Sequence, residues 1–163
     1  MAMRMSDNGK RLLKAWEGAE LKEYLDSAGK PTIGVGHLLS EAERASKRLS
    51  IGGLSVDYSN GLTESQVLAL LAEDLPRYET AVDDAVTVAL NPSQFDALAA
   101  FCFNIGIGAF KSSTLVRELN AGNHAKVPDE LRRWVNAGGK VSRGLVNRRE
   151  NEIKLWNGEL TVA

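Results

Sequence analysis

The sequence predicts an α+β fold that is dominated by helix. Three observations predict it: a glycine-punctuated, β-branched stretch near the N-terminus, a long apolar helical period in the middle, and several capped helical segments after it. The chain has 163 residues, of which 44% are hydrophobic and 25% charged. This length and composition suit one compact domain with a sizeable core.

The N-terminal part is predicted to begin with a helix and a hairpin. Ser6 can cap a helix that should end at Gly18. The glycines, the proline and the β-branched residues between Tyr24 and Leu39 predict a short hairpin. Residues 40–61 are rich in Gly, Ser and Asn, and they predict a helical turn followed by an irregular loop.

A long helix is predicted over residues 63–86. Thr63 and Gln66 have the spacing of a capping box, in which each side chain accepts from the other residue's backbone. Apolar residues follow at three- and four-residue steps, which is one face of a helix, and Pro76 could kink it. These apolar residues are Leu68, Leu71, Leu75, Tyr78, Val82 and Val86.

The C-terminal part is predicted to be entirely helical. Asn91-Pro92 opens a helix, with proline at its first position. Further helices are expected near 113–121, 128–137 and 144–157, each followed by a glycine. Together the elements predict a single domain over residues 1–163.

Within this domain we expect two lobes. A hairpin-bearing N-terminal lobe covers about residues 10–62, and a helical C-terminal lobe covers about residues 87–157. The long helix connects them. Residues 1–5 hold all three methionines and should be frayed.

Composition excludes several classes of function. Cys102 is the single cysteine, so no intramolecular disulfide can form, and its apolar neighbours indicate a buried thiol. Two histidines and one cysteine at unrelated spacings give no metal signature, and no cofactor is expected. No stretch has the length of a membrane span, and we expect no stable membrane insertion. The start lacks the apolar region of a signal peptide.

Charge is unevenly distributed along the chain. Residues 132–154 carry seven basic side chains against two acidic ones. This segment could approach an anionic polymer or a membrane surface, or it could form solvated helix faces. There is no basic–aromatic interleaving and no phosphate-binding glycine pattern, so nucleic acid is not an expected partner.

The stretch from Glu17 to His37 carries groups suited to acid–base chemistry. Glu17 falls in the last turn of the first predicted helix, where the helix dipole and Trp16 favour its neutral, proton-donating form. Asp26 lies in a loop, where its charged form is favoured, and Thr32 could orient a water. Two carboxyl groups in different surroundings suit glycoside hydrolysis, but the spacing alone favours ordinary surface charges.

The motifs around this spacing resemble a known family. WEG (16–18), TIGVGHLL (32–39), FNIGIGAFKSSTL (103–115) and GLVNRRENEIKLW (144–156) occur in order along nearly the whole chain. Together with the Glu17–Asp26–Thr32 spacing, they resemble the phage endolysins of glycoside hydrolase family 24, the muramidases of the T-even and lambdoid type. The resemblance implies two lobes with a cleft between them.

The resemblance also implies an activity and its residues. The activity is cleavage of the β-1,4 bond between N-acetylmuramic acid and N-acetylglucosamine in peptidoglycan. Glu17 corresponds to the proton donor, and Asp26 to the aspartate that positions water or stabilises the transition state. Thr32 corresponds to the third active-site residue. The residues at glycan-contacting positions are Leu38, Phe103 and Ser113, with Ser113 ambiguous by one residue.

Two further residues correspond to supporting positions of the family. His37 is expected to support the active-site hairpin, and Arg148 to pair with Glu17. A nearby guanidinium would favour the charged form of Glu17, against the helix dipole, and the sequence leaves open which effect prevails. Arg149 is expected to face solvent.

The resemblance further implies how such a protein is deployed. A monomeric enzyme would stay in the host cytoplasm until a holin opens the membrane, and would then act on the cell wall in the periplasm. Two alternatives stay open. A lytic transglycosylase would use one glutamate and leave 1,6-anhydro ends, and a non-enzymatic protein would bind the wall or membrane through the basic C-terminal segment.

Overall fold

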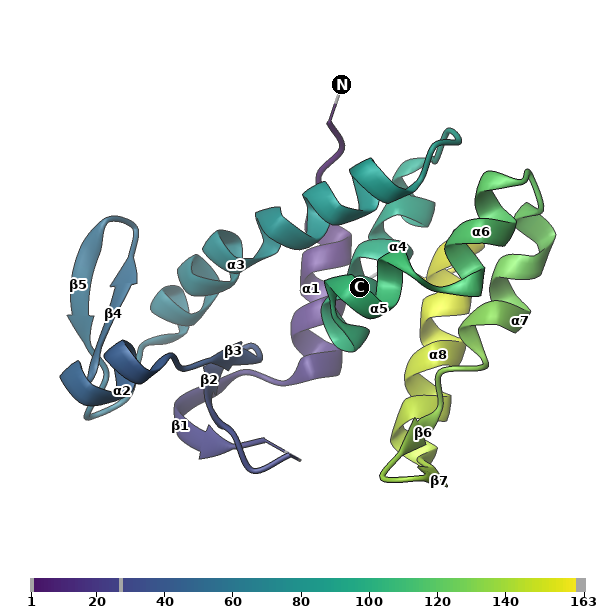
Figure 1. The fold of residues 1–163 in the computed structure, drawn as a ribbon. Helices are drawn as coiled ribbons and strands as arrows, with labels where there is room; N and C mark the ends of the chain where they lie inside the picture. The colour runs from purple at the N-terminus through teal and green to yellow at the C-terminus, as the bar shows by residue number, and fades with distance from the viewer. Residues whose placement is uncertain (1, 27, 161–163) are drawn as a thin grey trace. The chain divides into compact units, whose positions relative to one another are not determined.

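The computed structural model describes residues 2–26 and 28–160. They divide into two compact units. The small unit is Lys14–Pro76, and the large unit comprises the described residues of Met1–Leu13 and Arg77–Ala163. The division falls inside two helices that Figure 1 labels, α1 (Asp7–Glu17) and α3 (Glu64–Ala85).

The small unit is built on a three-stranded antiparallel sheet with the strand order β1-β2-β3. The predicted hairpin is therefore confirmed and extended, because its first strand starts earlier and a third strand joins it. After the sheet come a short helix and a second hairpin. The elements are β1 (Glu20–Leu25), β2 (Pro31–Gly34), β3 (His37–Leu38), α2 (Glu41–Ser46), β4 (Arg48–Ile51) and β5 (Leu54–Asp57).

The second hairpin corrects the prediction of an irregular loop within residues 40–61. Gly52 and Gly53 adopt φ values of 61° and 79°, which permit the tight two-residue turn between β4 and β5. Leu49 and Ile51 are buried while their neighbours along β4 are exposed. The two glycines thus form a tight turn that joins β4 to β5. They do not interrupt regular structure, as the sequence had suggested.

The long helix α3 confirms the predicted helix, with bounds one residue inside the expected range at each end. Its capping box is formed as expected: the Thr63 amide donates to Gln66 Oε1 at 2.9 Å, and the Gln66 amide donates to Thr63 Oγ1 at 3.1 Å. Pro76 lies inside the helix, which continues past it.

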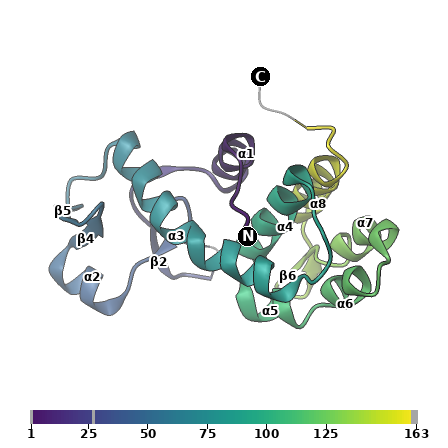
Figure 2. The ribbon, with the colours of Figure 1, turned by 90° about the horizontal axis from the view of Figure 1, so that it is seen from above.

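The large unit is mainly helical. Helix α4 packs along α8, and α6 lies beside α7, as Figures 1 and 2 both show. The core includes Phe95, Phe101 and Phe110, all fully buried. The elements are α4 (Pro92–Ile105), α5 (Ile107–Lys111), α6 (Thr114–Asn120), η1 (His124–Lys126), α7 (Val127–Leu131), β6 (Asn136–Ala137), β7 (Lys140–Val141) and α8 (Arg143–Trp156).

The predicted buried thiol is confirmed, because Cys102 is fully enclosed. Burial raises the pKa of this thiol to about 12 and outweighs the charge of Lys111, which lowers it. The thiol is therefore protonated at neutral pH, and its position suits packing rather than nucleophilic chemistry.

The large unit also differs from its prediction, because the expected helix over 128–137 ends at Leu131. The chain then forms the hairpin of β6 and β7, whose turn residues Gly138 and Gly139 adopt φ values of 59° and 79°. The Ser142 amide donates to the carbonyl of Val135 at 2.8 Å and closes the base of this hairpin. The C-terminal part is therefore not entirely helical.

The N-terminal segment is bound to the large unit, so the prediction of fraying for residues 1–5 is wrong at the described positions. The Met5 amide donates to Glu79 Oε2 at 2.6 Å, and the Ser6 amide donates to Asp96 Oδ1 at 2.9 Å. Burial raises the pKa of Asp96, while the bonds from Ser6 oppose that rise. The two acceptor residues lie 74 and 90 residues further along the chain than their donors.

Candidate active site

The predicted site residues are shared between the two units. Those of the small unit are Glu17, Asp26, Thr32, His37 and Leu38, and those of the large unit are Phe103, Ser113 and Arg148. The three residues predicted to carry the chemistry, Glu17, Asp26 and Thr32, thus belong to one compact unit.

Thr32 lies at the centre of the sheet. It is directly opposite Tyr24 on β1 and directly opposite Leu38 on β3. The side chain of Thr32 is only 2% exposed. Its Oγ1 donates to the carbonyl of Lys30 at 2.9 Å, which fixes the hydroxyl and leaves its lone pairs as acceptors.

Asp26 begins the turn between β1 and β2. Its Oδ1 accepts hydrogen bonds from the amides of Ala28 at 2.9 Å and Lys30 at 2.8 Å. Its own carbonyl accepts from Gly29, which adopts a φ of 77°. A side chain that accepts from the following backbone is a recurring turn device of aspartate. The turn therefore holds the carboxylate in a fixed orientation.

Glu17 is the last residue of α1 and is half-buried. Gly18 follows it with a φ of 79°, and its amide closes the helix on the carbonyl of Lys14 at 2.9 Å. Glu17 therefore lies at the negative end of the helix dipole, as the sequence predicted.

Tyr24 is a neighbour of these groups that the sequence reasoning missed. Burial raises its pKa most, and the negative charges of Glu17, Glu20 and Asp26 raise it further. Both predicted catalytic carboxylates therefore lie close enough to act on this phenol. In the sequence, Tyr24 lies two residues before Asp26, at the end of a strand. That position alone does not indicate a catalytic role.

His37 lies between two carboxylates of the small unit. Its Nδ1 is 2.7 Å from Asp74 Oδ2, and its Nε2 is 3.2 Å from Glu43 Oε1. Burial alone would lower the pKa of His37, but the hydrogen bonds and charges of Asp74 and Glu43 outweigh it and raise that pKa. Glu43 also caps α2 together with Ser40, so His37 links β3, α2 and α3.

Replacing His37 by Asn should destabilise the protein most in mildly acidic solution. The raised pKa of His37 gives a contribution that is complete below about pH 6.5 and is lost as the pH rises through the folded value. The lowered pKa of Glu43 gives a contribution that is present above about pH 4.5 and is lost as the pH falls. We expect a cost of roughly 2–4 kcal/mol near pH 5.5 and clearly less at pH 8.5.

Urea unfolding at the two pH values measures this difference. The matched control is His124→Asn, because the Nδ1 of His124 faces the carbonyl of Gly122 rather than a carboxylate. Its cost at each pH value is the reference against which the cost of His37→Asn is compared. If His37→Asn lowered the free energy of unfolding equally at both pH values, the result would contradict the raised pKa of His37 in the folded protein.

In the large unit, Phe103 and Ser113 have structural partners. The ring of Phe103 packs against Tyr78 with centroids 4.8 Å apart. Ser113 is buried and caps α6, since its Oγ donates to the carbonyl of Phe110 at 2.7 Å and accepts from the amide of Val116 at 3.3 Å. Their glycan contacts stay predictions.

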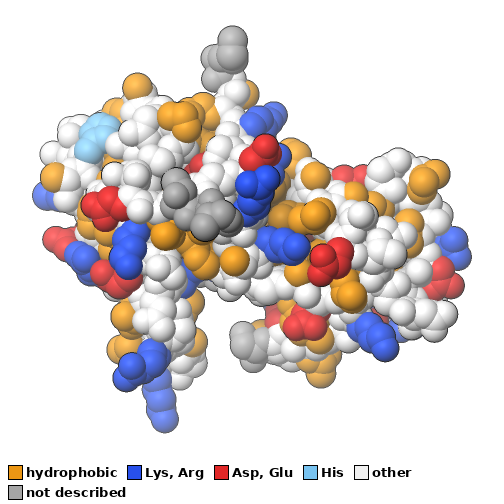
Figure 3. Space-filling model, turned by 180° about the vertical axis from the view of Figure 1, so that it is seen from behind, with side chains coloured by type: hydrophobic (Ala, Val, Ile, Leu, Met, Phe, Trp, Pro, Cys, Tyr) orange, Lys and Arg blue, Asp and Glu red, His pale blue; other side chains and the backbone are white. Residues whose placement is uncertain are grey.

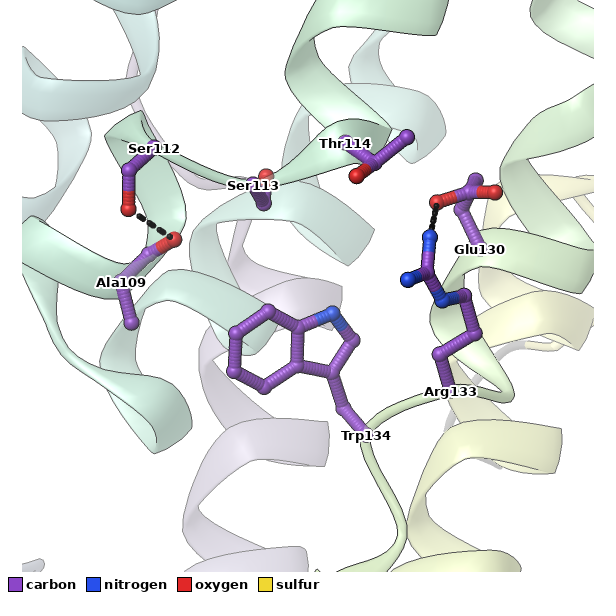
Figure 4. Close-up of a pocket in the computed structure, with 7 residues that line it drawn as sticks. All are labelled: Ala109, Ser112, Ser113, Thr114, Glu130, Arg133 and Trp134. Atoms are coloured by element: carbon purple, nitrogen blue, oxygen red, sulfur yellow. Dashed lines mark hydrogen bonds and ion pairs between the residues drawn. The ribbon is translucent and has the colours of Figure 1, made fainter.

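A pocket of about 260 Å³ lies beside this cap. Figure 4 shows the side chain of Trp134 and the ion pair of Arg133 with Glu130 around it, together with Ser112, Ser113 and Thr114. The family correspondence at Ser113 is ambiguous by one residue. All three candidates carry a hydroxyl and line this pocket: Ser112, Ser113 and Thr114.

Arg148 and Arg149 share one buried carboxylate. Arg148 Nε donates to Glu152 Oε2 at 2.9 Å, and Arg149 Nη1 donates to Glu152 Oε1 at 2.8 Å. Arg149 is 1% exposed, also donates to the carbonyl of Trp134, and lies over the ring of Phe101. The expectation that Arg149 faces solvent is therefore wrong, while the pairing of Arg148 with Glu17 stays a prediction.

Sequence comparison places relatives of this chain among phage proteins. The family model described as phage lysozyme matches residues 14–152. The endolysin of Salmonella phage P22 is 40% identical over 154 residues, which cover 94% of this chain and 98% of the relative. The endolysin of Bacillus phage B103 is 38% identical over 156 residues, which cover 94% of this chain and 54% of the relative.

This chain thus spans about half the length of the Bacillus phage relative, but nearly all of the Salmonella phage one. Structural comparison agrees with the sequence. The endolysin from Escherichia coli O157:H7 phage FAHEc1 superposes with a TM-score of 0.81 at 32% identity, covering 100% of this chain and 99% of that one.

Proposed function

This chain belongs to the phage lysozyme family, and from that premise we propose that it degrades bacterial peptidoglycan. The reaction is hydrolysis of the β-1,4 bond between N-acetylmuramic acid and N-acetylglucosamine. The observation that supports it best is the fixed arrangement of Asp26 and Thr32 on one hairpin of the compact unit that also holds Glu17.

Each of these residues has one chemical task in the proposal. Glu17 is the general acid and protonates the leaving glycosidic oxygen. Asp26, which the turn amides hold through Oδ1, directs its second oxygen to the attacking water or to the positive charge that develops on the sugar. Thr32 accepts a hydrogen bond from that water, because its own proton is used on Lys30.

Asp26→Asn should separate the turn role of this residue from its charge. The amide oxygen of Asn can still accept from Ala28 and Lys30, so the hairpin should keep its stability within about 1 kcal/mol. Hydrolysis should fall by roughly 10²-fold or more, because the negative charge is gone. Asp26→Ala removes both functions and should lose stability as well.

Thermal unfolding and the rate of fragment release from peptidoglycan measure the two effects. An Asp26→Asn variant that folds and retains the wild-type rate would remove the carboxylate from the mechanism.

The alternative of a non-enzymatic protein that binds through a basic segment is less well supported. Four of the seven basic side chains in residues 132–154 are engaged in ion pairs within the large unit. They are Arg132, Arg133, Arg148 and Arg149. On the face drawn in Figure 3, basic and acidic side chains lie intermixed over most of the surface, and basic side chains without acidic neighbours are confined to the projection at the lower left.

The same proposal includes where the enzyme acts. None of the helices in residues 2–26 and 28–160 has the length and apolarity to cross a bilayer. We infer that a holin opens the host membrane and that the enzyme then reaches the cell wall from the periplasmic side, as a monomer. The proposed substrate is the glycan strand of peptidoglycan.

The test of the proposed activity is digestion of purified, dye-labelled Gram-negative peptidoglycan by the folded wild-type protein. Soluble labelled fragments should appear with the wild type and be strongly reduced with Asp26→Asn. Absence of fragments from a wild type whose fold is verified by circular dichroism would overturn the proposed function and favour binding without catalysis.

A further inference from the structure

We propose that Tyr24 is a further active-site residue, whose hydroxyl holds the attacking water together with Thr32 and Asp26. This inference rests on the proposed function and extends it to a residue outside the predicted set. All the groups that carry the argument belong to the small unit.

The strand register places Tyr24 in the row of residues that contains the predicted site. Tyr24 is opposite Thr32 across β1 and β2, and Thr32 is opposite Leu38 across β2 and β3. Directly opposite residues of antiparallel strands project from the same face, with Cβ atoms about 4.5–5.5 Å apart. Tyr24, Thr32 and Leu38 therefore form one row across the sheet.

The surroundings of Tyr24 connect this row to both carboxylates. The side chain is half-buried, and after burial the largest influences on its pKa are the charges of Glu17, Glu20 and Asp26, all of which raise it. The raised pKa keeps the phenol protonated throughout the neutral range. It therefore offers an O–H donor beside the two residues proposed to perform the reaction.

The donors and acceptors of these side chains complement one another. Among residues 2–26 and 28–160 the Tyr24 hydroxyl has no hydrogen-bond partner, whereas the Tyr58 hydroxyl donates to the carbonyl of Glu43 at 3.1 Å. The Thr32 proton is used on Lys30, so Thr32 offers an acceptor. Asp26 uses Oδ1 for two turn amides, which leaves Oδ2 for a water.

A single water satisfies all three groups and keeps its nucleophilic lone pair. It donates one proton to Asp26 and the other to Thr32, and it accepts from Tyr24. Its second lone pair attacks the anomeric carbon, so that the new C–O bond forms as the glycosidic C–O bond breaks. Glu17 gives its proton to the leaving oxygen, and Asp26 takes the proton that the water loses.

Tyr24→Phe tests this assignment because it removes the hydroxyl and keeps the ring. We expect kcat on peptidoglycan fragments to fall about 10–100-fold while KM stays unchanged. In a fixed concentration of methanol, the ratio of methyl glycoside to free reducing ends should rise, because water bonds to all three groups, whereas methanol has one O–H proton, cannot donate to both Asp26 and Thr32, and depends less on the complete set. Mass spectrometry of the products measures that ratio.

The matched control is Tyr58→Phe, which removes a hydroxyl of the same unit that donates to the Glu43 carbonyl. It should lower the unfolding temperature and leave kcat and the methanol ratio unchanged. If Tyr24→Phe does not fold, a fluorinated tyrosine at position 24 tests the same donor. Its lower phenol pKa should move the loss of activity to a lower pH than in the wild type.

The outcomes separate this inference from the proposed function. An active wild type with an equally active Tyr24→Phe variant overturns the role of Tyr24 and leaves the muramidase intact. A fall in kcat with an unchanged methanol ratio also overturns it, because that is the result of a structural role. A wild type that cleaves nothing overturns the function and the role of Tyr24 with it.

Discussion

Replacing Glu17 by Gln is expected to abolish hydrolysis of peptidoglycan while the protein stays folded. Gln has the shape of Glu but cannot protonate the leaving oxygen, and the loss of a general acid typically costs 10²–10⁴-fold. With an alkoxide of a sugar as leaving group, we expect a fall of at least about 10³-fold. Initial rates of fragment release measure it.

The matched control for Glu17→Gln is Glu20→Gln. Glu20 begins β1, is exposed, and raises the pKa of Tyr24 as Glu17 does, but no task in the reaction is assigned to it. Its replacement should change the rate by less than about threefold. If Glu17→Gln kept a tenth or more of the wild-type rate, Glu17 could not be the proton donor.

Replacing Glu152 by Gln should cause the largest loss of stability. Glu152 is 0% exposed and is the shared partner of Arg148 and Arg149, which are also buried. Removing its charge takes away the buried carboxylate to which both guanidinium groups bond. Breaking a buried pair in this way costs about 3–5 kcal/mol. Urea unfolding at pH 7 measures the change in the free energy of unfolding.

Glu150→Gln is the control on the same helix. Glu150 pairs with Arg132 at 2.9 Å, but both side chains are more than 40% exposed. Water and salt screen such a pair, so the cost of removing it should be much smaller than that of Glu152→Gln. Equal costs for the two variants would show that burial does not strengthen the Glu152 cluster.

Helix bounds could be predicted where the signals are local. The capping box of Thr63 and Gln66 and the Asn91-Pro92 start each lie within four residues, and both helices begin where these signals indicate. The β4–β5 and β6–β7 hairpins were missed because their sequence signals are ambiguous. Gly-Gly pairs indicate a break in a helix as readily as a two-residue turn, and strands of two to four residues give little alternation.

Contacts between distant parts of the chain were beyond sequence reasoning. The N-terminal amides are bound by carboxylates 74 and 90 residues away, so the segment looked free. Arg149 was expected in solvent because charged residues are usually exposed, but Glu152, three residues on, and the Trp134 carbonyl compensate its burial.

The candidate site was predictable in part. Glu17, Asp26 and Thr32 were selected by their spacing and by the family resemblance, and the structure adds how the hairpin fixes two of them. Tyr24 was not selected, because a tyrosine at the end of a strand is ordinary. Its significance follows from the register with Thr32 and from the nearby charges, which only the folded hairpin provides.

The central claim is that Glu17, Asp26 and Thr32 carry out hydrolysis at N-acetylmuramic acid. The most direct measurement is digestion of purified peptidoglycan in water enriched in oxygen-18, followed by mass spectrometry of the fragment ends. We expect reducing N-acetylmuramic acid ends that carry one heavy oxygen and are missing with Glu17→Gln. Ends in the 1,6-anhydro form, without heavy oxygen, would contradict hydrolysis and establish a transglycosylase on the same substrate.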